Sequence, residues 1–287
     1  MIIDRLYDRV DKKGHVCVGL DTDLSYLPEF LIKKHSNISD SIFEFNKRII
    51  DSTKEYASCF KVQIAYYEAY GIDGMLAYKK TLEYLRSEDQ IIIADIKRGD
   101  ISKTAEMYAK AHFEGDFESD FITVNPYMGM DSIEPYLDYV KNKEKGLFVL
   151  VRTSNPGAKD IEYIETSTGS RVFKEVGKKI QKLGEDYIGD CGYSSLGGVV
   201  GCTHKDEGIE MRKELDKTFF LIPGYGAQGG GAKDVVPYLK EGNGGVVNSS
   251  RGILLAYKKA EGDPKDFDEY SRIEAKKMQE AILNEVK

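Results

Sequence analysis

Eight short apolar segments recur along this chain, and a longer amphipathic segment follows each of them. The apolar segments cover residues 15–20, 59–63, 91–96, 121–124, 147–152, 197–201, 219–223 and 245–248. The helical patterns that follow them cover residues 39–56, 74–86, 102–113, 131–141, 170–183, 207–215, 233–239 and 270–285. Short apolar runs rich in β-branched residues suit strands that are covered on both faces. This eightfold alternation is typical of α/β proteins and predicts a (β/α)8 barrel, also called a TIM barrel.

A doubly wound open sheet is the competing fold, because periodicity alone does not show that a sheet closes on itself. No Gly-x-Gly-x-x-Gly pattern follows the first strand, which weakens a dinucleotide-binding interpretation. The chain has 287 residues, a length at which α/β barrels commonly form one domain, and no Pro-, Gly- or Ser-rich linker divides it. We therefore expect a single barrel domain over residues 1–287.

The composition is that of an ordinary globular protein, with 41% hydrophobic and 31% charged residues. The net charge of −7 argues against nucleic acid or an anionic membrane as the main partner. The N-terminus lacks signal-peptide architecture, and no apolar run approaches transmembrane length. The four cysteines form no Cys-x-x-Cys pair, and the four histidines show no metal-ligand spacing. We expect a cytoplasmic protein with reduced thiols and no bound metal.

Charged residues gather where the first three predicted strands end. Asp21 follows the first strand, Lys61 lies in the second, and the third runs into Asp95-Ile96-Lys97-Arg98-Gly99-Asp100. Strand alternation puts Asp95 and Lys97 on the same side, and Gly99 allows a sharp turn after them. Buried charge is costly unless it is paired, and parallel α/β proteins build their active sites at the C-terminal ends of strands.

A structural ion-pair network is the alternative interpretation of these charges, and Asp100 alone could simply cap the helix that follows it. The convergence of four charges at one barrel mouth favours catalysis, and these four are Lys61, Asp95, Lys97 and Asp100.

Two glycine-containing loops follow the last two predicted strands. Residues 223–231 read Pro-Gly-Tyr-Gly-Ala-Gln-Gly-Gly-Gly, and residues 248–252 read Asn-Ser-Ser-Arg-Gly. Glycines let backbone N–H groups approach an anion closely, and Arg251 can add a bidentate clamp. A plain flexible turn is the alternative for the first loop. Because barrels often bind phosphate between these two loops, the arginine after the last strand favours a phosphate site.

Taken together, these motifs resemble the orotidine 5′-phosphate decarboxylase family, in its longer bacterial subfamily (type 2). The signature is Asp95-x-Lys97-x-x-Asp100-Ile101-x-x-Thr104, and residues 60–68, 153–157, 223–230 and 248–252 also match. The resemblance covers nearly the whole chain. It implies a homodimeric barrel with shared active sites that converts orotidine 5′-phosphate to UMP and CO₂ in de novo pyrimidine biosynthesis, without metal or organic cofactor.

The resemblance also implies roles for the matched residues. Lys97 would protonate C6 of the pyrimidine within an alternating array in which the neighbouring subunit supplies Asp100. Ile101 and Thr104 would enter the partner's site together with Asp100. Asp21, Lys61 and Asp100 would hold the ribose hydroxyls. The remaining substrate contacts would be made by Ser154 to the pyrimidine, and by Gln228, Gly229 and Arg251 to the phosphate. Gln228 would also reach Ser154 as a latch, and residues 155–170 are expected to form a lid over the base.

Two rival functions share part of this pattern. Mg²⁺-dependent sugar-phosphate decarboxylases or aldolases of the same superfamily share the Asp-x-Lys-x-x-Asp motif. They carry an acidic metal ligand at the end of the second strand, where this chain has Lys61, whose charge would oppose a divalent cation. A catalytically silent nucleotide-binding regulator is the other rival. It is disfavoured because binding alone does not require a lysine between carboxylates.

Overall fold

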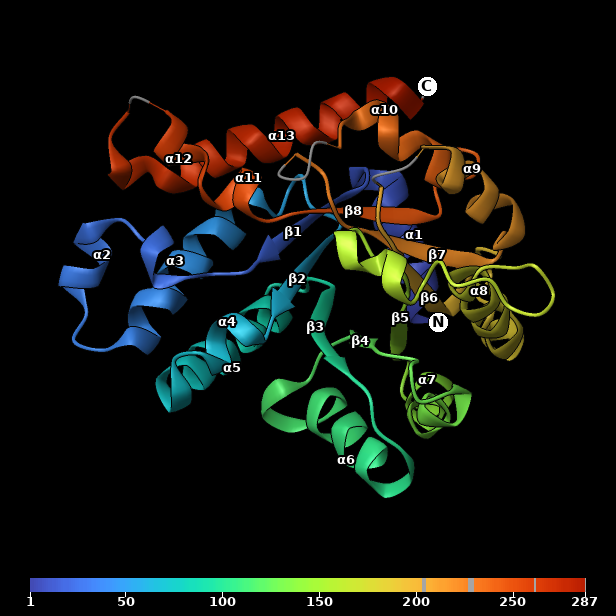
Figure 1. Cartoon of the computed structure of the whole chain (residues 1–287). Helices are drawn as coiled ribbons and strands as arrows, with labels where there is room; N and C mark the ends of the chain where they lie inside the picture. Colours follow the sequence, from blue (N-terminus) through green and yellow to red (C-terminus); the bar gives the residue numbers. More distant parts are fainter. Residues whose placement is uncertain (203–204, 227–229, 261, 287) are drawn as a thin grey trace.

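Eight parallel strands form a closed barrel in which every strand pairs with its neighbours in sequence and β1 pairs with β8 (Figure 1). The computed structural model describes residues 1–202, 205–226, 230–260 and 262–286. The strands are β1 (Val16–Leu20), β2 (Cys59–Gln63), β3 (Ile92–Arg98), β4 (Phe121–Val124), β5 (Gly146–Arg152), β6 (Ser194–Val200), β7 (Thr218–Ile222) and β8 (Gly245–Ser249). The predicted (β/α)8 barrel is confirmed, and the open doubly wound sheet is wrong.

Helices surround the barrel on its outside (Figure 1). The α-helices are α1 (Ile2–Lys13), α2 (Glu29–Lys34), α3 (Ile38–Thr53), α4 (Ala65–Glu68), α5 (Gly71–Ser87), α6 (Ser102–Phe113), α7 (Leu137–Asn142), α8 (Val172–Leu183), α9 (Lys205–Glu214), α10 (Ala232–Val235), α11 (Arg251–Leu254), α12 (Ala256–Lys259) and α13 (Phe267–Val286). Short 3₁₀ turns join them at η1 (Leu24–Tyr26), η2 (Gly115–Phe117), η3 (Met130–Ser132), η4 (Glu134–Tyr136), η5 (Pro156–Asp160), η6 (Gly184–Tyr187), η7 (Val236–Tyr238) and η8 (Pro264–Asp266).

Two of the predicted helices are broken into shorter pieces. The segment 131–141 contains the turns η3 and η4 before α7 begins, and the segment 233–239 divides into α10 and η7. Each segment contains a proline, Pro135 or Pro237, near the start of its 3₁₀ turn. Proline has no backbone N–H and its ring clashes with the preceding turn, so neither residue can continue an α-helix interior.

Helix α1, which the strand–helix repeat did not predict, lies across the N-terminal ends of the strands. Its buried residues are Ile2, Ile3, Leu6 and Val10. They belong to the same apolar cluster as three phenylalanine side chains of the strands, Phe121, Phe148 and Phe219. Its ends and polar side chains also hold the segments that lead into the strands. Arg9 donates to the carbonyl oxygen of Asp89, before β3, at 2.7 Å, and the Asp4 carboxylate accepts from the N–H of Cys191, before β6, at 2.9 Å. The N-terminal end of the barrel is therefore closed.

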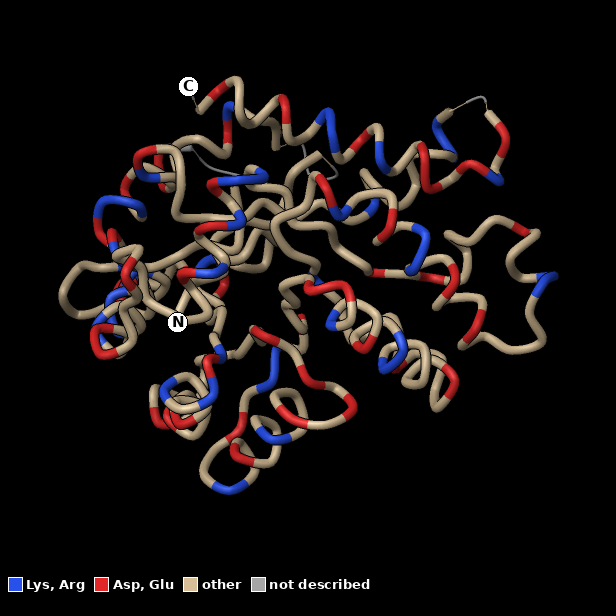
Figure 2. Tube along the Cα trace, turned by 180° about the vertical axis from the view of Figure 1, so that it is seen from behind, with Lys and Arg blue, Asp and Glu red and all other residues tan. Residues whose placement is uncertain are grey.

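Lysine and arginine alternate with aspartate and glutamate along the outer helices when the molecule is seen from behind (Figure 2). The pattern agrees with a moderate net charge made of many opposite charges. None of the helices in the described part of the chain is long and apolar enough to cross a membrane.

Candidate active site

Four charged side chains form an alternating chain of ion pairs at the C-terminal end of the barrel. The Nζ atom of Lys61, in β2, lies 2.9 Å from Oδ1 of Asp21 and 3.0 Å from Oδ2 of Asp95. Asp95, in β3, accepts from Nζ of Lys97 through its other oxygen at 2.6 Å. The order is Asp21–Lys61–Asp95–Lys97, and the prediction that Asp95 and Lys97 share one side of the strand is confirmed.

The two central residues of this row of ion pairs, Lys61 and Asp95, are buried, whereas Lys97 is partly exposed at the C-terminal end of the barrel. Lys61 and Asp95 are each 5% exposed, while the Lys97 side chain is 45% exposed. Burial alone would lower the pKa of Lys61, but the Asp21 and Asp95 carboxylates outweigh it and raise the pKa. Burial alone would raise the pKa of Asp95, but the two lysines hold it well below its usual range. Asp95 is therefore a fixed anion that anchors a reachable ammonium group.

Two neutral side chains that the sequence analysis did not identify complete the surroundings of Asp95. Gln63 Nε2 donates to Asp95 Oδ2 at 2.9 Å, and Thr123 Oγ1 donates to Oδ1 at 2.9 Å. Thr123 Oγ1 also accepts the backbone N–H of Lys97 at 2.9 Å. With two lysines and two neutral donors, the carboxylate has a partner for nearly every lone pair and cannot turn freely. Two features of the sequence could have pointed to these residues. Gln63 follows Lys61 by two residues in β2, and Thr123 is the polar residue of β4.

The backbone of Lys97 is held in the left-handed region, with a φ of 45°. The pairing of β3 with β4 shifts register between Ala94 and Arg98, so the strand bulges where the lysine stands. A non-glycine residue with positive φ costs about 1–3 kcal/mol and persists only where its surroundings enforce it. Gly99 is not in this region; its role is close approach, because a Cβ there would lie 3.0 Å from the carbonyl oxygen of Asn125.

Asp100 does not join the ion pairs of its own chain. Its carboxylate accepts the backbone N–H of Ile101 at 2.9 Å, and no ion pair links it to a lysine among the residues that the structure describes. The interpretation of Asp100 as a helix cap is wrong, because Ile101 occupies the N-cap position of α6. Thr104 lies in the first turn of α6, and both Ile101 and Thr104 are exposed. In the described part of the chain, none of these three residues makes a side-chain hydrogen bond or ion pair with Asp21, Lys61, Asp95 or Lys97.

A cavity of about 380 Å³ lies beside the ion-paired residues Lys61, Asp95 and Lys97. Lys61, Asp95 and Lys97 line it on one side, and residues 153–155 line it on another. Ser154 therefore borders the same cavity as Lys97. Asp21 contacts this group through Lys61, and its second oxygen accepts from Ser250 Oγ at 2.8 Å.

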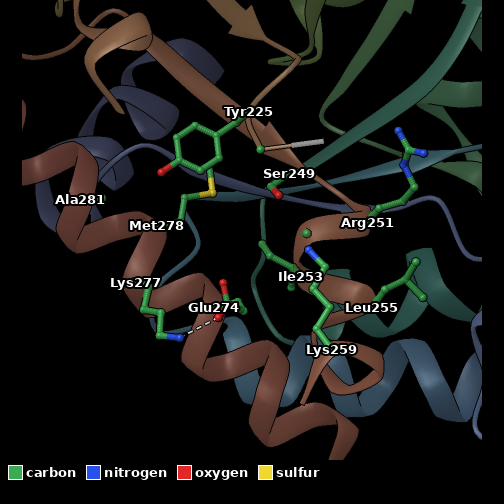
Figure 3. A pocket seen from close by; sticks show the side chains of 12 residues that line it. Tyr225, Ser249, Arg251, Ile253, Leu255, Lys259, Glu274, Lys277, Met278 and Ala281 are labelled. Carbon is green, nitrogen blue, oxygen red and sulfur yellow. Dashed lines mark hydrogen bonds and ion pairs between the residues drawn. The ribbon is translucent and has the colours of Figure 1, made fainter. Parts of the chain in front are cut away.

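A second cavity, of about 540 Å³, lies between the turns after β7 and β8 and helix α13 (Figure 3). Arg251, the first residue of α11, borders this cavity, and Figure 3 shows its side chain pointing away from Glu274 and Lys277 of α13. The lining residues of the two cavities do not overlap, so Arg251 does not border the cavity that holds Lys97. The consecutive residues Asn248 and Ser249 each line one of them, which makes β8 their common wall. Gln228 and Gly229 lie outside the described residues.

In the described ranges of the chain, no group of three or more His, Cys, Asp or Glu side chains is arranged to hold a metal ion. The position at the end of β2 where the rival decarboxylases carry an acidic ligand is occupied by Lys61, which is ion-paired on both sides. The residues present here suit electrostatic and proton-transfer chemistry on an anionic substrate.

The closed barrel, with ion-paired lysines at the C-terminal end of its strands, has the architecture of a (β/α)8 enzyme. Residues 14–262 match the model of the "Orotidine 5′-phosphate decarboxylase / HUMPS family". The chain belongs to this family.

Curated relatives and solved structures agree with the family match. The chain is 67% identical over 285 residues to the orotidine 5′-phosphate decarboxylase of Clostridium novyi, covering 99% of each chain. It is 65% identical to that of Clostridium kluyveri, covering 99% of this chain and 97% of the relative. The OMP decarboxylase structure of Leishmania donovani is 28% identical, with a TM-score of 0.78 over 99% of this chain and 98% of the other. A putative orotidine-monophosphate decarboxylase from Toxoplasma gondii is also 28% identical, with a TM-score of 0.83 over 99% and 97%.

Proposed function

We propose that this chain is an orotidine 5′-phosphate decarboxylase, a carboxy-lyase that converts orotidine 5′-phosphate to UMP and CO₂ in pyrimidine biosynthesis. The observation that carries the proposal is the Asp21–Lys61–Asp95–Lys97 chain of ion pairs, which leaves the Lys97 ammonium facing a cavity bordered by Ser154. Relatives that are 63–67% identical over nearly their full length bear this name. The whole chain, residues 1–287, acts as one catalytic domain in the cytoplasm.

Lys97 is the catalytic acid. When the bond between C6 and the carboxyl group breaks, CO₂ leaves and the electron pair remains on C6 of the ring, where it has little resonance delocalisation. An ammonium held beside C6 stabilises this pair and then transfers a proton to it, which completes the C6–H bond of UMP. The exposed side chain of Lys97 and its short contact with Asp95 support this role.

Asp95 and Lys61 prepare the site for that proton transfer. Asp95 keeps Lys97 cationic and in place, since its other partners fix the carboxylate. It also brings a negative charge towards the carboxylate that is lost, which disfavours the bound substrate relative to the product. Lys61 balances the charge of Asp95 and, together with Asp21, binds ribose hydroxyls. The pyrimidine contacts Ser154.

The phosphate is bound by the loops after β7 and β8. Arg251 begins α11 and makes no ion pair among the described residues, so its guanidinium is available to an anion. Gln228 and Gly229 are proposed to contact the same phosphate. Binding energy from this remote group lowers the chemical barrier by closing loops over the base and excluding water.

The enzyme works as a homodimer in which Asp100 completes the array of the partner subunit. Support comes from the Asp100 carboxylate, which accepts the backbone N–H of Ile101 and pairs with no lysine of its own chain among the described residues. Support also comes from exposed apolar side chains in the segments that follow β3 and β4, namely Ile101 (45%), Met107 (54%), Tyr127 (78%) and Met128 (47%). Such side chains suit a protein–protein contact. Ile101 and Thr104 enter the partner's site with Asp100.

A spectrophotometric assay with orotidine 5′-phosphate in the presence of EDTA tests the proposal. We expect the substrate absorbance to fall as UMP forms, at the same rate with and without EDTA. Activity that EDTA abolishes and Mg²⁺ restores would support the metal-dependent rival instead. Protein that binds UMP but leaves the substrate absorbance unchanged would be a nucleotide-binding regulator.

A further inference from the structure

The turn formed by residues 153–155 borders the cavity beside Lys97. Glu162, in the loop that follows, forms hydrogen bonds to Thr153, the first residue of this turn. The backbone N–H of Thr153 donates to Oε2 of Glu162 at 2.9 Å. The Thr153 hydroxyl lies 2.5 Å from Oε1 of Glu162 and 2.7 Å from Oδ1 of Asn155. Its single proton is best donated to the charged and closer oxygen of Glu162. One carboxylate thus fixes both the backbone and the side chain of the residue before Ser154.

The next residue of the same loop is anchored to the barrel and to α9. The Tyr163 hydroxyl lies 2.7 Å from both carboxylate oxygens of Glu207, in α9, and accepts from NH2 of Arg152 at 3.0 Å. Arg152, the last residue of β5, is 3% exposed and also pairs with Glu207 at 3.1 Å. The Arg171 guanidinium lies 4.6 Å from the centre of the Tyr163 ring. Tyr163 therefore connects the end of β5, the loop and α9.

Gly201, the residue after β6, supports the turn from its other side. A Cβ at Gly201 would lie 2.9 Å from Cβ of Ser154 and 3.2 Å from its backbone nitrogen. The N–H of Gly201 donates to the carbonyl oxygen of Arg152 at 2.9 Å. The turn is therefore packed against bare backbone on one side and held by Glu162 on the other, so its position depends on both.

We propose that Glu162 and Tyr163 are positioning residues that set the place of Ser154 and thereby control recognition of the pyrimidine base. Neither lines the cavity, so both act through the turn. The inference rests on the proposed function, since Ser154 is the residue proposed to contact the base. The hydrogen bonds of the loop 156–171 then select for the pyrimidine ring, whereas Arg251, which borders the other cavity, acts on the phosphate.

The test compares two ligands that differ in the base. Titration calorimetry measures the Kd of UMP and of ribose 5-phosphate for the wild type, Glu162→Gln and Tyr163→Phe. The matched control is Glu165→Gln, because Glu165 lies in the same loop, is exposed and makes no side-chain hydrogen bond or ion pair among the described residues. We expect Glu162→Gln to weaken UMP binding about tenfold, because Glu162 holds the turn directly. Tyr163→Phe should weaken it about threefold, because the Tyr163 hydroxyl contacts Glu207 and Arg152 and acts on the turn only through its neighbours. Ribose 5-phosphate should bind all four proteins equally.

A partly unfolded variant lowers the number of binding sites but does not change the ratio of the two Kd values, which separates positioning from stability. Equal weakening of both ligands, or no weakening of UMP, would overturn the inference. The wild type is assayed for decarboxylation alongside. A wild type without turnover contradicts the proposed function, whereas an active wild type whose variants bind UMP normally contradicts only the roles of Glu162 and Tyr163.

Discussion

The two ends of the barrel differ in the kind of side chain that they bury: charged at the C-terminal end and apolar at the N-terminal end. At the C-terminal end, buried Lys61 and Asp95 are linked to the half-exposed Lys97, whose backbone is strained. At the N-terminal end, α1 covers apolar rings such as Phe121 and Phe148, whose centres lie 5.1 Å apart. Strain and buried charge are tolerated at one end because apolar packing at the other contributes the stability. Activity and stability should therefore respond separately to mutations at the two ends.

The largest effect is expected from Lys97→Ala. Removal of the ammonium deletes both the stabilisation of the charge on C6 and the proton donor, so kcat should fall more than about 10⁴-fold. The free energy of unfolding should change by less than about 1 kcal/mol, since Lys61, Gln63 and Thr123 still bind Asp95. Decarboxylation assays and urea titrations measure the two quantities.

The control for that variant is Lys33→Ala, at a lysine that is 72% exposed in α2. It should change neither quantity. A Lys97→Ala protein with near-normal turnover would refute the catalytic role, and one that unfolds would show that the two ends of the barrel are not separable.

The second largest effect is a loss of stability, expected from a substitution at the N-terminal end of the barrel. Leu6 is fully buried in α1, and Leu6→Ala should lower the free energy of unfolding by about 3 kcal/mol through lost apolar contacts and a cavity. The value of kcat/KM at 25 °C should stay within about twofold of wild type, because the folded fraction remains high. Asp11→Ala, on the exposed face of the same helix, is the control and should be nearly neutral. A specific loss of kcat with unchanged stability would break the comparison.

A third prediction separates substrate binding from chemistry within the C-terminal end. Arg251→Ala should raise KM for orotidine 5′-phosphate about 100-fold with a smaller change in kcat, since a charge-assisted bidentate contact is lost. Lys259→Ala, which alters another cation beside the same cavity, is the control and should leave KM nearly unchanged. If KM is unchanged in Arg251→Ala, the phosphate does not bind at this arginine.

The smallest effect concerns a buried histidine in the helix layer, away from both ends. Burial, with a contribution from the nearby Arg98 charge, lowers the pKa of His112 to about 4. The unfolded chain binds this proton near pH 6.5, so stability should rise with pH between these values and be lost as pH falls. Between pH 7 and pH 5 the loss from His112 is about 2 kcal/mol.

Urea titrations at pH 7 and pH 5 on the wild type and His112→Leu check this prediction. The variant should lose less stability on acidification than the wild type. Part of the pH dependence should remain, because burial also lowers the pKa of His15 at the start of the barrel. Identical losses in both proteins would show that folding does not lower the pKa of His112.

The sequence predicted the barrel well because each strand is a short, largely apolar run between helical patterns. It also predicted that Asp95 and Lys97 lie together, since alternation along one strand requires only local information. Helix α1 was missed because no strand precedes it and it falls outside the repeat, although Ile2, Leu6 and Val10 show its amphipathic spacing.

Features that depend on neighbouring strands were beyond the sequence. Gln63 reaches Asp95 because the two residues are register partners across β2 and β3, and register is set by the closed barrel. Thr123 meets Asp95 only because β4 pairs with β3 through a bulge. The positive φ of Lys97 has the same origin, and sequence reasoning assigned the special conformation to Gly99 instead.

The most direct test of the account mixes two inactive subunits. In a homodimer with shared sites, a Lys97→Ala subunit still supplies Asp100 to its partner, and an Asp100→Ala subunit still carries Lys97. Subunit exchange at equal concentrations should place one intact site in each mixed dimer and restore about a quarter of wild-type activity. Each variant alone should remain inactive in the same decarboxylation assay. Mixed dimers that form, as shown by mass spectrometry of differently tagged chains, yet recover no activity would contradict the shared charged array.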